Sequence, residues 1–136
     1  FIALEKAHLN KGWKLVDNWH PDNKAGKRNG FVDVPMLEAT RPGDRLTLDF
    51  RGKAIGIFCV SGPSAGILEY SVDSAPFKEL DTFTEWSHNL YIPWVYMLET
   101  ELKDTDHKLV LRISKKKNPA SQGTECQIRN FVVNGR

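Results

Sequence analysis

Alternation of apolar and polar residues with a period of two is the feature that most restricts the fold of this sequence. Leu46, Leu48 and Phe50 alternate with polar residues, and the segments 68–72 and 107–114 repeat the pattern. Successive side chains of a β-strand point to opposite faces of the sheet. Each segment therefore predicts a strand with one buried and one exposed face.

Two further segments predict strands of a different kind. Residues 54–60 are apolar at almost every position, which is typical of a central strand covered on both faces. Residues 125–133 predict a closing strand, but their alternation slips between Ile128 and Phe131. A slip of this kind predicts a β-bulge rather than a change to helix.

The connections carry the residues that favour turns. Glycine, proline, asparagine, aspartate and serine gather in residues 41–44, 61–66, 73–76, 103–106 and 118–123. No window of a dozen residues has a clean helical period, and Pro93 weakens the nearest candidate, residues 95–102. Many short strands without helices predict an all-β, two-sheet sandwich or a barrel. Residues 12–19 predict an initial strand, followed by a long polar loop.

The length and the charge of the chain limit the classes of protein to which it can belong. A chain of 136 residues forms one domain, 1–136, and no apolar run approaches the ~20 residues of a transmembrane helix. The 19 basic and 17 acidic residues are interleaved, which argues against a nucleic-acid partner. The basic run 115–117 is interpreted as a solvated loop in preference to a phosphate site. Because the sequence begins at Phe1, we expect a mature product or a piece of a longer protein.

Neither cysteine nor histidine spacing predicts a metal site. Cys59 and Cys126 are too few for a zinc site, and buried free thiols are favoured over a disulfide between the sheets. The four histidines are scattered, without a pair at ligand spacing, at positions His8, His20, His88 and His107. No metal and no cofactor are therefore assigned.

The densest cluster of ligand-type side chains lies in residues 86–94. Sugars combine apolar faces with a rim of hydroxyls, which suits aromatic rings flanked by polar donors. If the early loop lies at the same end of the sandwich, the candidate carbohydrate-binding residues are Trp86, His88, Asn89, Tyr91, Trp19, His20 and Arg28. The alternative is that Trp86, Tyr91 and Trp94 pack in the core or against a partner domain. Within the cluster, Trp86 and His88 are expected to be exposed.

The order of motifs from Gly30 to Gly135 resembles the β-sandwich domain appended to bacterial SGNH (GDSL-type) hydrolases, which include carbohydrate esterases. The matching motifs are residues 31–35, 42–44, 50–56, 62–66, 70–73, 80–81 and 128–135, with Leu102 and His107. The resemblance implies a jelly-roll, galactose-binding-like fold, in which His107 anchors a turn and Gly56 allows a close approach to the central strand. It also implies a secreted or periplasmic accessory domain that holds sugar beside an esterase. Sandwiches of this kind often carry structural calcium, for which the spacing assigns no residues.

Catalysis by the chain itself is not predicted. An SGNH hydrolase needs a Gly-Asp-Ser nucleophile block and a late Asp-x-x-His. Asp17 and His20 have the second spacing, but no Gly-Asp-Ser occurs in the chain. Three hypotheses remain: a glycan-binding accessory domain, an interaction domain without ligand, and an esterase fragment in which Asp17 and His20 are catalytic.

Overall fold

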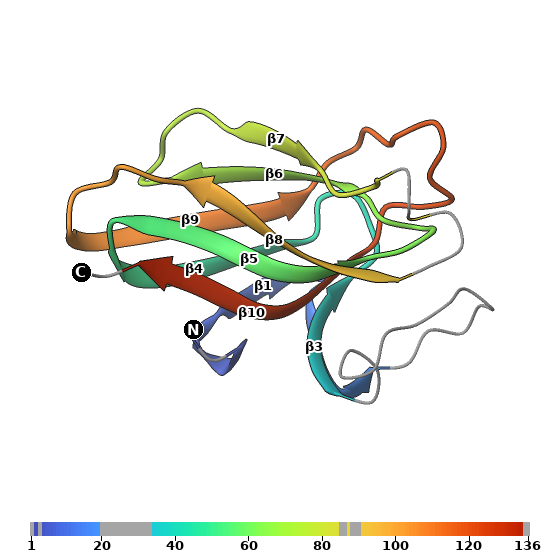
Figure 1. Cartoon of the computed structure of the whole chain (residues 1–136), viewed down its shortest axis with the longest axis horizontal. Coiled ribbons are helices and arrows are strands. Elements are labelled where there is room, and N and C mark those ends of the chain that lie inside the picture. Colours follow the sequence, from blue (N-terminus) through green and yellow to red (C-terminus); the bar gives the residue numbers. More distant parts are fainter. Residues whose placement is uncertain (1, 3, 20–33, 85–86, 88–90, 135–136) are drawn as a thin grey trace.

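Two five-stranded antiparallel sheets, packed face to face, make up the domain (Figure 1). The computed structural model describes residues 2, 4–19, 34–84, 87 and 91–134. Sheet I has the order β1 (His8–Lys11), β4 (Arg45–Gly52), β9 (Thr105–Ile113), β6 (Ile67–Val72) and β7 (Lys78–Asp81). Sheet II has the order β2 (Lys14–Trp19), β3 (Val34–Ala39), β10 (Cys126–Asn134), β5 (Ala54–Ser61) and β8 (Ile92–Glu99). The predicted all-β, two-sheet sandwich is confirmed.

The described helical structure is limited to one short segment. It is the 3₁₀ turn η1 (Leu4–Lys6), whose Leu4 is buried in the core. No helix in the described part of the chain has the length and apolar character needed to span a membrane.

The alternation in the sequence sets which face of each strand is buried. Leu46, Leu48 and Phe50 of β4 lie in the core, together with Leu109 and Leu111 of β9. Buried apolar side chains from both sheets fill the space between them, and this burial is the main favourable term in folding. The observed strands begin and end within two residues of the predictions for residues 44–50, 54–60, 68–72, 107–114 and 125–133. The predicted bulge is confirmed, since the pairing of β10 with β5 shifts between Ile128 and Asn130.

The prediction of one initial strand at residues 12–19 is wrong about where that strand begins. β1 ends at Lys11 in sheet I, and β2 begins at Lys14 in sheet II. The chain changes sheets between them, at Gly12, whose φ is +76°, and at Trp13, whose side chain is buried in the core. A change of sheet interrupts the alternation that a single strand would show, and glycine tolerates the positive φ.

Gly56 confirms the close approach expected at the central strand. A Cβ there would lie 2.6 Å from the Tyr96 carbonyl oxygen and 2.7 Å from Met97 Sδ of the neighbouring strand β8. Only glycine fits this approach without moving β8.

His107 anchors the turn before β9, as the resemblance implies. Its Nδ1 lies 2.5 Å from Asp73 Oδ2, and its Nε2 lies 2.7 Å from the Lys103 carbonyl oxygen. Asp73 Oδ1 also accepts the Lys108 N–H at 2.9 Å. The hydrogen bond with Asp73 raises the pKa of His107, and the same bond lowers the pKa of Asp73. The turn and the β6–β7 hairpin are thereby tied through one charged pair.

A pH-dependent loss of stability is expected for His107→Gln. The charged imidazole stabilises the fold fully below the ordinary histidine pKa of 6.5, and this contribution is lost as pH rises through the raised pKa. The Asp73 contribution is present above the ordinary pKa of 3.8 and is lost as pH falls through the lowered pKa. Chemical denaturation should show the largest difference from wild type, about 1–2 kcal/mol, between those two pH values.

The matched control is His8→Gln, because His8 is an exposed histidine on β1. Its difference from wild type should stay small and constant across the same pH range. A His107→Gln difference that is equally large at pH values well above the raised pKa would show that the charged pair does not contribute.

Candidate functional site

Three loops meet at one end of the sandwich, opposite the hairpin that joins β8 to β9 (Figure 1). They connect β5 to β6, β7 to β8 and β9 to β10. The Ser121 hydroxyl donates to the Ala65 carbonyl at 2.7 Å, and the Gly66 N–H donates to the Glu125 carbonyl at 2.8 Å. These bonds fasten the β5–β6 loop to the β9–β10 loop.

The β7–β8 loop, which contains the aromatic cluster of the sequence, is anchored to both of the others. The Thr82 hydroxyl donates to the Gly66 carbonyl at 2.6 Å, and Asn118 Nδ2 donates to Asp81 Oδ2 at 2.8 Å. Further along the loop, the buried Ser87 hydroxyl accepts the Thr84 N–H at 3.0 Å. Ser87 stands between Trp86 and His88 in the sequence, so the loop has an internal anchor at the predicted site.

Trp19 and Tyr91, which come from the two segments that the sequence singles out, are in contact. Their ring centroids lie 5.3 Å apart at an interplanar angle of 72°. Both rings are buried, and they form a small apolar cluster with Met36 and Val60. Met36 and Val60 alternate with core residues of β3 and β5, so this cluster lies on the outer face of sheet II, away from sheet I. The two rings are therefore packed among other side chains and do not form an exposed aromatic surface.

A polar network lies beside these rings. Trp19 Nε1 donates to Glu38 Oε2 at 3.1 Å, and Gln127 Nε2 donates to the same oxygen at 2.8 Å. Gln127 Nε2 also lies 3.2 Å from Glu125 Oε1, so one buried amide joins two carboxylates. Carboxylates accept hydrogen bonds from sugar hydroxyls, and this pair is held in place by the sheet.

Sequence reasoning missed Glu38, Glu125 and Gln127. Glu38 and Gln127 face each other because β3 pairs with β10 in this register. Each residue alone looks like an ordinary polar position of a half-exposed strand. Only the pairing of strands distant in the sequence brings them together.

The remaining predicted residues are distributed as follows. Trp86, His88, Asn89, His20 and Arg28 lie outside the described residues, and their contact with a ligand stays a prediction. Trp94 is exposed on the edge strand β8, although its apolar surroundings in the sequence indicate burial.

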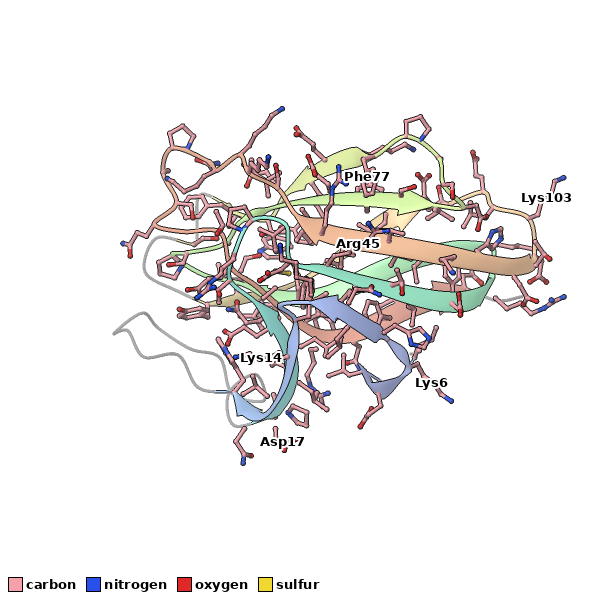
Figure 2. The ribbon with its side chains drawn as sticks, turned by 180° about the vertical axis from the view of Figure 1, so that it is seen from behind. Lys6, Lys14, Asp17, Arg45, Phe77 and Lys103 are labelled. Atoms are coloured by element: carbon pink, nitrogen blue, oxygen red, sulfur yellow. The ribbon has the colours of Figure 1, made fainter. Side chains whose placement is uncertain are left out.

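Asp17 is exposed at the far end of β2, at the margin of the molecule (Figure 2). Within the described part of the chain, no hydrogen bond or ion pair orients its carboxylate.

The two cysteines are buried free thiols, as predicted. Burial raises the pKa of Cys59 to about 12 and raises the pKa of Cys126 well above its usual range. The thiolate is the reactive form of cysteine, so neither residue is poised as a nucleophile. Among the described residues, no group of three or more histidine, cysteine, aspartate or glutamate side chains is arranged to hold a metal ion.

An exposed apolar patch extends the outer face of sheet II towards its edge. It consists of the exposed Val95 and Met97 of β8 and the partly buried Phe58 of β5, which pairs with Val95. Val95 is 50% exposed and Met97 is 45% exposed. We call these three residues the outer apolar patch.

Solved structures with this fold include domains of carbohydrate-active proteins. A two-domain esterase active on acetylated mannans aligns with a TM-score of 0.62 and 15% identity over 97% of this chain and 37% of the esterase. A family two carbohydrate esterase from Cellvibrio japonicus aligns with a TM-score of 0.55 and 11% identity over 96% of this chain and 32% of that protein. A family 35 carbohydrate-binding module from Clostridium thermocellum aligns with a TM-score of 0.56 and 13% identity, over 95% of this chain and 92% of the module.

No family model matches the sequence, and neither does any curated protein. At identities of 11–15% the likeness concerns the fold. The predicted resemblance to the β-sandwich domains of carbohydrate esterases is confirmed at that level. The chain thus has the β-sandwich fold shared by esterase domains and a carbohydrate-binding module, and it spans about a third of the two esterases.

Proposed function

We propose that this chain is a noncatalytic accessory domain that binds or positions a glycan beside an SGNH (GDSL-type) esterase domain in a secreted or periplasmic bacterial protein. The observation that carries the proposal is the contact between Trp19 and Tyr91. It brings the early segment to the aromatic cluster, beside the carboxylates of Glu38 and Glu125. The similar fold of a carbohydrate-binding module supports the same function.

Binding of a neutral glycan by this chain, weakened by Trp86→Ala, is the expected result. Mannan is the first probe, because one similar esterase is active on acetylated mannans. Affinity electrophoresis should show a loss of about tenfold or more in affinity for Trp86→Ala, since stacked aromatic side chains dominate such sites.

The control is Phe77→Ala, which removes an exposed aromatic side chain on sheet I, the sheet opposite the Trp19–Tyr91 cluster. This variant should bind mannan as the wild type does. Equal losses in both variants, or no binding to any neutral glycan on an array, would refute glycan binding at the aromatic cluster.

The second candidate function is an interaction domain that packs on a catalytic domain without ligand. The outer apolar patch favours it, because exposed apolar side chains that lie together mark protein contacts. Failure to bind any glycan would favour this function.

The third hypothesis, catalysis through Asp17 and His20, requires that the chain alone hydrolyse a chromogenic acetate ester and lose that activity in His20→Ala.

A further inference from the structure

Three basic residues lie side by side across the outer face of sheet I. Lys11 of β1 pairs with Arg45 of β4, and Arg45 pairs with Arg112 of β9. Like charges at directly opposed positions of antiparallel strands destabilise a sheet. An anion that lies over such a row removes the repulsion.

Two grooves flank the turn of residues 40–44 beside this row. Their volumes are about 450 and 520 Å³. The basic side chains that line them, which we call the basic belt, are Lys11, Lys14, Arg41, Arg45, Arg112, Lys115 and Lys116. Figure 2 shows the molecule from the side of sheet I, and two residues of the belt, Arg45 and Lys14, are labelled in it.

The belt concentrates charge that the whole chain lacks. Seven of the 19 basic residues line the two grooves, together with two of the 17 acidic residues. The rest of the chain then holds 12 basic and 15 acidic residues, so its formal charge is negative although the net charge is +2.

The acidic residues of the grooves leave most of the belt's charge uncompensated. Glu69 accepts a hydrogen bond from Arg112 Nε at 2.7 Å. Asp44 is buried, and its carboxylate accepts the N–H groups of Thr40 and Arg41. Just outside the grooves, Lys116 Nζ lies 3.0 Å from the Glu79 carboxylate.

Among the described residues, no ion pair engages Lys11, Arg45 or Lys115. These three cations face the grooves and remain available to an external anion.

The belt is also partly rigid. The Arg112 guanidinium lies 3.6 Å from the centroid of the Phe77 ring while Glu69 holds its Nε, so its position is set from two sides. The Arg112 side chain is 36% exposed, and a guanidinium is well suited to carboxylate or sulfate oxygens.

We propose that the basic belt binds an anionic polysaccharide, whose sugar units carry carboxylate or sulfate groups, as a second glycan-binding surface. The choice of a glycan rests on the proposed function, whereas the need for an anion rests on the charges alone. A single-stranded nucleic acid fits less well, because its bases need open aromatic faces for stacking. Phe77, the aromatic ring beside the described belt, is covered by Arg112.

Titration of the chain with polygalacturonate, heparin and neutral mannan tests the proposal. Wild type should bind at least one of the two anionic polymers, with a log K that falls linearly with log salt through release of counterions. The double variant Arg45→Gln/Lys115→Gln should bind that polymer about tenfold more weakly near 0.1 M salt, and its salt slope should be shallower by about two. Comparing the carboxylate polymer with the sulfate polymer identifies the anionic group.

The control is Lys6→Gln/Lys103→Gln, which removes the same charge from two lysines at the opposite end of the face shown in Figure 2. Its affinity and salt slope for the anionic polymer should match the wild type. Equal losses in both double variants, or absence of binding to both anionic polymers, would overturn the proposal. Single-stranded DNA bound as tightly as the anionic glycan would also overturn it.

The proposal for the basic belt and the proposal for the aromatic cluster can be refuted independently. The belt variant should retain mannan binding, and Trp86→Ala should retain binding to the anionic polymer. Mannan binding without binding to the anionic polymers therefore refutes the belt and leaves the proposed function standing. Binding to the anionic polymer that Trp86→Ala abolishes refutes the belt as a separate surface.

Discussion

Replacement of Phe131 by alanine is expected to lower the free energy of unfolding by about 3–5 kcal/mol. Phe131 is 0% exposed and lies between the sheets on β10, opposite Ile57 of β5. Its backbone carbonyl also accepts the Ile2 N–H at 2.9 Å, where the start of the chain joins sheet II. Alanine would leave a cavity that neighbours from two sheets cannot fill without distortion. Denaturant unfolding, monitored by tryptophan fluorescence, measures the loss.

Phe77→Ala is the matched control for this effect. It removes the same ring from a side chain that is 38% exposed. Its cost should be smaller, about 1–2 kcal/mol, because the ring is partly exposed and its removal leaves no enclosed cavity. Similar costs for the two variants would contradict the assignment of Phe131 to the centre of the core.

Gly12→Ala is expected to cost about 3 kcal/mol or more, the second large effect. Gly12 has a φ of +76°, which costs about 1–2 kcal/mol for a residue with a Cβ. A Cβ would also overlap the buried Asp44 carboxylate, which accepts the N–H groups of Thr40 and Arg41. Displacing that buried carboxylate breaks both hydrogen bonds, at a further cost of about 1–3 kcal/mol. The free energy of unfolding from denaturant titration is the measurement.

Gly43→Ala separates the two causes. Gly43 has a similar φ of +89°, but the nearest atom to a Cβ there is Lys11 Nζ at 3.9 Å. This variant should show the backbone cost alone. If both variants lose the same stability, the Asp44 carboxylate contributes nothing to the effect of Gly12→Ala.

Local patterns were enough to predict five of the ten described strands, namely β4, β5, β6, β9 and β10. On β4 and β9 the alternation shows directly which side chains face the core, because the period of a strand is two residues. The bulge after Ile128 also has a local signal, whereas the turn anchored by His107 was expected from the resemblance to galactose-binding-like sandwiches. β8 had a weaker signal, because its apolar residues occur on both faces and the exposed side of an edge strand follows no pattern.

The site was predicted in part. The sequence singled out the early segment and the aromatic cluster but left open whether they share one end of the sandwich, and the structure shows Trp19 in contact with Tyr91. The sequence did not predict that both rings are buried, nor that Glu38 and Gln127 flank them. Burial on an outer face depends on which loops and strands cover it, and no local pattern records that.

By itself, the sequence determined the all-β class, the buried faces of β4, β6 and β9 and several of the turns, because these depend on neighbours two to four residues away. Only the tertiary structure determines which side chains those strands bring together. The contact of Trp19 with Tyr91, the exposure of β8 and the row of Lys11, Arg45 and Arg112 all depend on sheet order and register. Register between distant strands is set by the packing of the whole core, so no single segment encodes it.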